Sequence, residues 1–266
     1  MSVDRGRRNV LEGAAAALFL SVAGTAFMRS GPVAARNATK VDHRRLLTIT
    51  YPAGSSIRFD ADYYRDHHVK LFMDIYGSAI ERFEMRTPAP SQAGAFSVLM
   101  NIWIADFDLF RSRSTPAAYQ RMGDDKHNFT NTSSAIQVDE VTHGSGEPRA
   151  NIPRGCGCLS LLYPSGPAGA WNDDAQSRAY VDGLTKLLGR DVLRRIELRK
   201  GIEQLDDGNP TYQGGINLYA RNPAAFSRAW QRNRDAVAKL STQLCSETPL
   251  ELSTTVFGIA STSHET

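Results

Sequence analysis

The residues best equipped for chemistry lie together at 59–68, where the sequence reads FDADYYRDHH. On a helix, Tyr64 and His68 are four residues apart and share the apolar face with Leu71 and Phe72. A neutral imidazole can take a proton from an acidic C–H group or a phenol near pH 7, because its ordinary pKa is close to that pH. A histidine on an apolar face can equally be a hydrogen-bonded core residue.

Aromatic residues elsewhere could complete a site around His68. Tyr51 and Tyr64 could hydrogen-bond the enolate or phenolate oxygen that proton transfer leaves behind, and Trp103 with Phe129 could form an aromatic floor. Phe72 is also expected to line the substrate pocket. The alternative for Tyr51 and Trp103 is a packing role, since aromatic residues in strands commonly pack.

Other polar residues of the same region are expected to stay out of the chemistry. His67, beside Asp66, is expected on an exposed helix surface. Asp125 and Asn128 are expected to cap a helix end or a turn rather than to contact substrate. The sequence has no Gly-rich dinucleotide fingerprint, P-loop, G-x-S-x-G elbow or H-E-x-x-H motif, so the usual parts for nicotinamide redox chemistry, phosphoryl transfer, serine hydrolysis and zinc proteolysis are missing.

A strand and a helix must position these groups. The β-rich run 47–51 stops at the turn-forming sequence PAGSS, 52–56. A helix is then expected to begin near Asp60, whose carboxylate can cap the free N–H groups of the first turn.

Three segments together carry a family resemblance. The string FDADYYRDHHVKL followed by Gly77, the string MGDDKHNFTN at 122–131 and the closing strand IQVDEV at 136–141 resemble the EthD family of ferredoxin-like α+β domains over about residues 45–143. The family's usual proline after the histidine is Lys70 here, and its aspartate-x-x-asparagine-phenylalanine-threonine run is matched at 125–130.

The resemblance implies an oxidoreductase-like role. Relatives of this barrel include cofactor-independent monooxygenases that act on polycyclic phenols, haem-binding enzymes, and isomerases or decarboxylases. It therefore favours a cofactor-independent oxidoreductase in which His68 activates a small hydrophobic phenolic or enolic substrate. The alternatives are an isomerase or decarboxylase using the same deprotonation, a non-catalytic module for a small apolar ligand and, ranked below these, haem binding by His68, because one histidine makes no haem signature.

The N-terminal sequence indicates export. Arg7 and Arg8 precede an apolar run from Gly13 to Met28, and VAA at 33–35 suits signal cleavage, so 1–35 is interpreted as a twin-arginine signal peptide. The run is shorter than the ~20 residues that span a bilayer. We therefore expect a protein outside the cytoplasm without stable membrane insertion.

Composition places the remainder among ordinary globular proteins. The chain of 266 residues is 41% hydrophobic and 22% charged, with a formal charge of +3. Cleavage after residue 35 would remove four arginines and two acidic residues and leave +1, so no nucleic-acid partner is expected. Of three cysteines, Cys156 and Cys158 are too close in sequence for an easy bridge. A bridge from either to Cys245 and a buried thiol both stay open, and no metal-ligand spacing is present.

The second half of the chain repeats the first in degenerate form at an offset of 112 residues. LTITYP at 47–52 is echoed by LSLLYP at 159–164, Phe59 by Trp171, Gly77 by Gly189 and, after a slip of one residue, FEMR at 83–86 by IELR at 196–199. Each half reads β-α-β-β-α-β, giving an EthD-like domain at 45–144 and a second repeat at 155–260.

The repeat predicts an α+β fold in which two ferredoxin-like halves form an intrachain version of a dimeric α+β barrel. Each sheet then covers the apolar face of the other, so the chain is expected to be a monomeric pseudo-dimer or a larger association of such barrels. At this offset His68 corresponds to Tyr180, and DKHNFTN has no counterpart near 232–245. The sequence therefore predicts one working pocket, in the first half.

Overall fold

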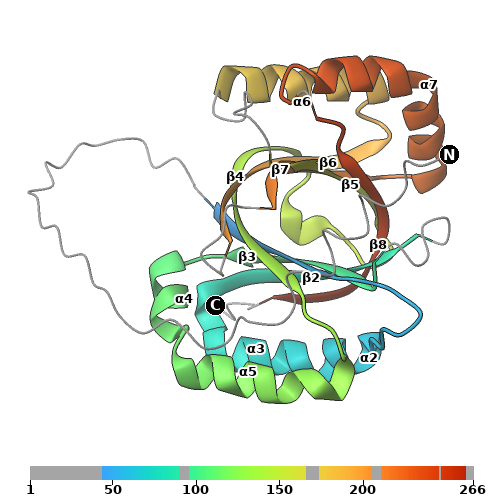
Figure 1. Ribbon diagram of the computed structural model, residues 1–266. Helices are drawn as coiled ribbons and strands as arrows, with labels where there is room; N and C mark the ends of the chain where they lie inside the picture. Colours follow the sequence, from blue (N-terminus) through green and yellow to red (C-terminus); the bar gives the residue numbers. More distant parts are fainter. Residues whose placement is uncertain (1–43, 90–95, 166–173, 205–210, 246, 262–266) are drawn as a thin grey trace, which may run out of the picture. The chain divides into compact units, whose positions relative to one another are not determined.

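Eight antiparallel strands close into a barrel with helices on its outside (Figure 1). This computed structural model describes residues 44–89, 96–165, 174–204, 211–245 and 247–261, all within one unit, His43–Thr266. The interpretation of residues 1–35 as a signal peptide lies outside the described residues. The prediction of an α+β fold built on an antiparallel barrel is confirmed.

The strands and helices follow each other in a regular order. The strands are β1 (Arg44–Tyr51), β2 (Ile80–Pro88), β3 (Val98–Ile104), β4 (Ala135–Gly146), β5 (Gly157–Pro164), β6 (Leu193–Gln204), β7 (Tyr212–Ala220) and β8 (Leu250–Ser261). The helices are α2 (Ala61–Tyr63), a π-helical turn (Tyr64–His68), α3 (Val69–Tyr76), α4 (Phe107–Arg113), α5 (Pro116–Phe129), α6 (Asp174–Leu188) and α7 (Pro223–Ser241).

Around the barrel the strands run β1-β3-β2-β8-β5-β7-β6-β4. The first four strands are therefore neighbours in the order β4-β1-β3-β2, and the last four in the order β8-β5-β7-β6. Pairing of β2 with β8 and of β4 with β6 closes the ring, so each of these described strands has a partner on both sides. Helices α2 to α5 lie on one side of the barrel, and α6 and α7 on the opposite side (Figure 1).

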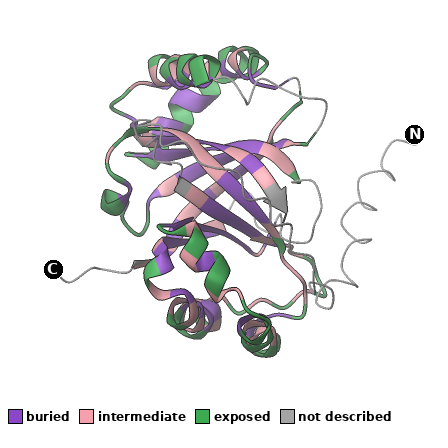
Figure 2. Cartoon of the chain, turned by 90° about the vertical axis from the view of Figure 1, so that its left-hand side faces the viewer, coloured by how far each residue is buried: buried purple, intermediate pink, exposed green. Residues whose placement is uncertain are grey.

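Apolar clusters fill the space between the helices and the outer faces of the strands. One cluster joins β1 to β4 with α3, α4 and α5, and includes Phe83 and Ile102, each at most 1% exposed. Another joins β5 to β7 with α6 and α7, and includes Leu184 and Leu218. Figure 2 shows the resulting pattern, with buried strands inside and exposed outer faces on the helices. Truncating a fully buried side chain such as Phe83 to alanine would cost about 3–5 kcal/mol.

The first helix begins as the sequence predicts. Asp60 caps it, because its side chain accepts a hydrogen bond from the backbone N–H of Tyr63 at 2.9 Å. The α-helical pattern then changes to a π-helical turn at Tyr64–His68 before it resumes in α3. Gly77 ends this helix with a φ of 49°, a backbone conformation that glycine adopts without strain.

Two further features concern cysteines and membranes. Cys156, Cys158 and Cys245 are all buried free thiols, so the bridge to Cys245 that the sequence left open is not formed. None of the helices in the described ranges combines the length and the apolar character that crossing a bilayer requires.

Candidate functional site

A buried histidine–carboxylate pair is the centre of the candidate site. His68 Nδ1 lies 2.7 Å from Asp125 Oδ2, which joins the end of the π-helical turn to α5. The ring is carried by the π-helical turn, in which the Val69 N–H donates to the Tyr64 carbonyl five residues earlier. Residues four apart share one face of such a turn, as they do in an α-helix. Tyr64 and His68 consequently both point into the core, at 2% and 6% exposure.

Asp125 is fixed by two further hydrogen bonds. Its Oδ1 accepts from the Tyr63 hydroxyl at 2.8 Å and from Asn128 Nδ2 at 3.0 Å. The expectation that Asp125 caps a helix end or a turn was wrong, because its carboxylate is hydrogen-bonded to the side chains of His68, Tyr63 and Asn128. The expectation that it does not contact substrate stays a prediction. The available signal was the D-x-x-N spacing of Asp125 and Asn128, which places both side chains on one face of α5.

Aromatic rings enclose the imidazole. The centroid of the Phe129 ring is 4.5 Å from that of His68, and the Tyr64 ring is 4.8 Å away. Tyr51 lies one layer further out, 5.8 Å from Tyr64, and Phe59 packs against Tyr51 at 4.9 Å. The structure thus brings together four residues singled out in the sequence, namely His68, Tyr64, Tyr51 and Phe129.

The other two predicted lining residues lie elsewhere. Phe72 belongs to the same apolar cluster, but it packs against Tyr76 and Phe83, further along α3. Trp103 lies on the opposite face of the sheet, inside the barrel, where Arg149 stacks on its ring at 4.6 Å. The prediction that Trp103 helps to form the floor beneath His68 is wrong, because alternation along β3 turns its neighbour Ile102, not Trp103, towards the helices.

His67 has the exposed position that the sequence predicts. Its ring stacks on Tyr63 with centroids 4.6 Å apart. It therefore makes a natural control for His68, because it is the same residue type, one position away, on the solvent side of the helix.

The electrostatics of the cluster favour a neutral base beside an ionised acid. Burial lowers the pKa of His68 below its ordinary value, although the hydrogen bond to Asp125 opposes this shift. Burial raises the pKa of Asp125, but hydrogen bonds from His68, Asn128 and Tyr63 outweigh it and the pKa is lowered. When Nδ1–H donates its hydrogen bond to the Asp125 carboxylate, Nε2 carries no proton and is the basic nitrogen of the imidazole.

The two phenols keep their protons at neutral pH. Burial raises the pKa of Tyr51 to about 12 and that of Tyr64 well above its ordinary value. Both hydroxyls are therefore hydrogen-bond donors rather than bases. This suits them to stabilise an oxyanion near the imidazole.

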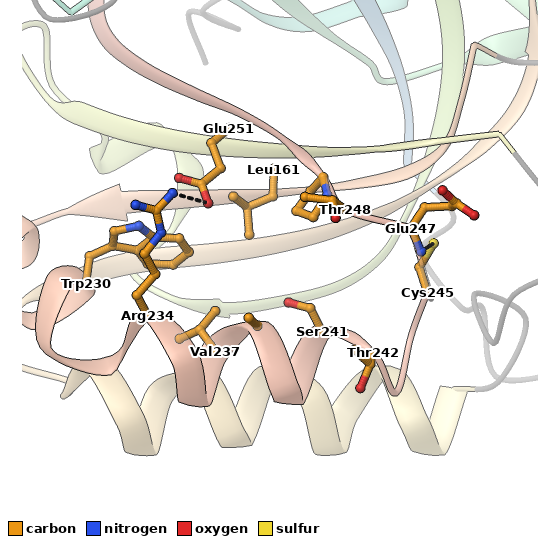
Figure 3. Close-up of a pocket in the computed structure, with 12 residues that line it drawn as sticks. Leu161, Trp230, Arg234, Val237, Ser241, Thr242, Cys245, Glu247, Thr248 and Glu251 are labelled. Atoms are coloured by element: carbon orange, nitrogen blue, oxygen red, sulfur yellow. Dashed lines mark hydrogen bonds and ion pairs between the residues drawn. The ribbon is translucent and has the colours of Figure 1, made fainter. Parts of the chain in front are cut away.

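A cavity of about 250 Å³ lies in the second half, between β5, α7 and the segment that leads into β8 (Figure 3). Leu161, Trp230 and Val237 form apolar walls, and an ion pair of Arg234 with Glu251 at 3.6 Å lies beside them. The expectation of one pocket, in the first half, did not anticipate this cavity.

Three hydroxyl groups meet beside that cavity. Ser241 Oγ lies 3.0 Å from the Tyr163 hydroxyl and 2.9 Å from the Tyr180 hydroxyl, and the two phenols are 3.2 Å apart. Two sequence signals pointed to this cluster, since Tyr163 and Tyr180 correspond to Tyr51 and His68 at the 112-residue offset. Within the described ranges no three histidine, cysteine, aspartate or glutamate side chains are grouped to hold a metal ion.

Comparison with known proteins establishes the fold. No family model matches the sequence, and no curated protein is significantly similar to it. Several solved structures match the chain. The structure of an anthrone oxidase-like protein matches at 12% identity with a TM-score of 0.56, and the match covers 85% of this chain and 96% of the matched chain. A proposed monooxygenase from Fusobacterium nucleatum matches at 6% identity and a TM-score of 0.56, over 83% and 95%.

A third match is a proposed monooxygenase from Lactobacillus acidophilus, at 6% identity and a TM-score of 0.55, over 83% of this chain and 97% of that one. The chain therefore shares the fold of these proteins, and in this chain that fold is an antiparallel barrel of eight strands with helices outside. At such low identity the likeness concerns the fold, while the names describe the matched proteins.

Proposed function

We propose that this protein is a cofactor-independent oxidoreductase acting on a small hydrophobic phenol or enol, with His68 as general base. The observation that carries the proposal is the buried pair of His68 Nδ1 and Asp125 Oδ2 at 2.7 Å, enclosed by aromatic rings. The resemblance to the EthD family and the oxidase and monooxygenase names of proteins with this fold support the redox class. Independence from a cofactor rests on the resemblance.

In the proposed reaction His68 Nε2 takes a proton from the substrate, and the Asp125 carboxylate stabilises the imidazolium that forms. The hydroxyl of Tyr64 or Tyr51 donates a hydrogen bond to the substrate oxygen on which negative charge develops. The electron-rich anion then reduces dioxygen. For an activated methylene group the reaction balances when the group and one dioxygen molecule give one carbonyl group and one water molecule. His68 returns its proton to the oxygen atom that leaves as water.

Substrate must reach an imidazole that is only 6% exposed. Phe59 is the partly exposed member of the aromatic cluster and packs over Tyr51 and Tyr64. It sits just before α2, at an isolated bridge to Thr130. We propose that displacement of the Phe59 ring opens the path to His68, which makes Phe59 a positioning residue rather than a catalytic one.

The deciding experiment is oxygen uptake by the purified protein with a panel of one- to three-ring phenols and anthrone-type methylene compounds. An absorbance spectrum of the protein comes first, because it reveals a bound haem or flavin directly. We expect oxygen consumption to match product formation one to one. Product formation at an unchanged rate under strict anaerobiosis would refute the oxidoreductase and favour an isomerase or decarboxylase, since the same pair supports deprotonation without oxygen.

A second candidate function is non-catalytic binding of a small apolar ligand. The cavity of about 250 Å³ in the second half favours it, because its lining is mainly apolar and its hydroxyl groups could orient one polar ligand atom. Trp230 lines the cavity and would report binding through its fluorescence. A ligand that binds, is recovered chemically unchanged and gives no product would identify this function.

We also propose that the barrel arose from a tandem duplication, with halves at 45–144 and 155–260 packed as an intrachain pseudo-dimer. The support is repetition inside the barrel. Arg-x-Glu-x-Arg recurs at 82–86 and 195–199, and the pair Thr48–Asn101 has a counterpart in Ser160–Asn217 at the same place in the ladder. Such a chain needs no second copy to close its barrel.

Export remains a proposal from sequence. Arg7, Arg8, the short apolar run and the VAA sequence at 33–35 support transport of the folded protein by a twin-arginine route, with a mature chain that begins near Arg36. N-terminal sequencing of exported material tests the cleavage site. An intact Met1 or Ser2 would indicate an uncleaved anchor instead.

A further inference from the structure

The middle of the barrel interior is polar and closed at both ends. The side chains of β5 that point inward are Cys158, Ser160 and Leu162, which change from apolar to polar to apolar along the strand. The same change occurs on β8 at Leu252, Thr254 and Val256. One end is packed by Phe96, Leu99, Leu162 and Leu252, and the other by Ile152, Cys158, Tyr219 and Val256. These apolar layers separate the polar middle from solvent.

Two arginine–asparagine pairs cross the polar middle of the barrel, and each pair joins a strand of one half to a strand of the other. Arg199 Nη1 of β6 donates to Asn101 Oδ1 of β3 at 2.8 Å, and Arg86 Nη1 of β2 donates to Asn217 Oδ1 of β7 at 3.1 Å. All four residues are at most 1% exposed. Gly215 makes room for one guanidinium, because a Cβ there would come within 2.6 Å of Arg199 Nε.

Each of these four residues has a donor with no partner. Within the described ranges, Arg86 Nε, Asn101 Nδ2, Arg199 Nη2 and Asn217 Nδ2 are buried and make no hydrogen bond. One buried carboxylate oxygen in the same ranges, Glu197 Oε2, also lacks a partner. An unsatisfied buried donor is strongly unfavourable, so the excess of donors over acceptors calls for an additional acceptor.

The polar middle of the barrel and the residues on either side of it also carry more positive than negative side chains. Five guanidiniums, those of Arg82, Arg86, Arg149, Arg195 and Arg199, line the interior. Three buried carboxylates face them, with Glu81 at the rim as a fourth. Burial raises the pKa of Asp139, although Arg199 and the hydrogen bonds from Thr48 and Gln137 oppose this shift, and burial lowers the pKa of Arg199.

We propose that the barrel centre binds one small inorganic anion of halide or nitrate size, held by Arg86, Asn101, Arg199 and Asn217. An anion accepts several hydrogen bonds and offsets the surplus charge, whereas water would satisfy the donors alone. The apolar layers at both ends favour a small anion over a larger one. This site is independent of His68 and stands whether or not the protein is an enzyme.

The test is thermal unfolding of the full chain at pH 7.5 and constant ionic strength, with sodium gluconate replaced stepwise by sodium chloride or sodium nitrate. Binding to the folded state predicts a midpoint that rises by roughly 3–5 °C for each tenfold increase in the small anion above its dissociation constant. Equal midpoints in all three salts would overturn the proposal. They would indicate that water satisfies the donors.

A variant and a matched control locate the anion. Arg199→Met removes a guanidinium with an unpartnered donor and should abolish the dependence on salt type. Arg82→Met removes a buried barrel guanidinium that donates to Glu84 and to the Ile152 carbonyl, and should retain that dependence. If Arg199→Met kept it, the anion would bind elsewhere and the proposal would fail.

Crystals of the unaltered protein grown in bromide give a result that needs no variant to fold. We expect one anomalous peak within hydrogen-bond distance of Arg86 or Arg199, inside the barrel. A barrel centre without bromide, in crystals that show bromide only on the surface, would also overturn the proposal.

Discussion

Replacing His68 by glutamine tests the centre of the proposed site. The effect on stability can be measured without a substrate, and the effect on turnover once a substrate is known. Glutamine keeps an amide donor for Asp125, which also retains its hydrogen bonds from Tyr63 and Asn128. The loss is then the packing of the imidazole against Phe129 and Tyr64 and the quality of one hydrogen bond, together about 1–3 kcal/mol. For a unit of this size that is a fall in melting temperature of roughly 2–12 °C.

The difference in the free energy of unfolding between the wild type and His68→Gln should depend on pH with a definite sign. Because burial lowers the pKa of His68 in the folded state, the unfolded chain binds more protons below pH 6.5. The stabilisation is therefore complete above about pH 6.5 and is lost as the pH falls towards the folded-state pKa, by about 1.4 kcal/mol for each pH unit between the two values. The stability gap between the wild type and His68→Gln should narrow between pH 7.5 and pH 5.

Urea unfolding at several pH values measures this gap, with His67→Gln as the control. His143, whose pKa burial also lowers, contributes equally to each protein and cancels in the difference. The exposed His67 should give a curve parallel to that of the wild type. A gap between wild type and His68→Gln that stays constant from pH 7.5 to 5 would refute the assignment of a buried neutral imidazole.

Turnover separates a catalytic His68 from a structural one. Loss of a positioned general base lowers kcat by about 10²–10⁴, while His67→Gln should leave kcat nearly unchanged. If activity in His68→Gln instead fell only in proportion to the unfolded fraction, His68 would be a satisfied core residue and the base would have to be sought elsewhere.

Three other perturbations test the pairing, the packing and the export route. Asp125→Asn should lower kcat by roughly 10²-fold or more and move the acidic limb of the pH–rate profile to lower pH, since the carboxylate stabilises the imidazolium and raises the pKa of His68; an unchanged profile would contradict the pairing. Residues 36–148 expressed alone should give a homodimer or an insoluble product, because the strands lose their cover, and sedimentation would show a stable monomer if this packing argument were wrong. Lysine at both Arg7 and Arg8 should retain the protein in the cytoplasm, whereas export at the normal level in cell fractionation would contradict a twin-arginine route.

Local features of the site were predictable because they depend on neighbouring residues. The cap at Asp60, the shared face of Tyr64 and His68 and the exposure of His67 all follow from spacing on one helix. Asp125 was assigned to a cap because its partner lies 57 residues away in sequence. Pairing over that distance depends on how α5 packs beside the π-helical turn, which no local pattern specifies.

The position of Trp103 could not be predicted for a different reason. All seven residues of β3 are buried, so the strand has no alternation of apolar and polar residues to show which face is inside. In β2 the alternation exists as Arg82-x-Glu84-x-Arg86, but charged alternate positions ordinarily indicate a solvated face. Closure of the barrel buries that face, and closure is a property of all eight strands together.

The proposed duplication also explains where the chemistry can lie. At the 112-residue offset Tyr51 corresponds to Tyr163 and His68 to Tyr180, and in the second half these two phenols bond to each other and to Ser241. Burial raises the pKa of Tyr180 well above its ordinary value, so this hydroxyl cannot act as a base near neutral pH. The second half can therefore hold a neutral ligand through hydroxyl groups, while the proton transfer that we propose for the first half uses an imidazole with a carboxylate beside it.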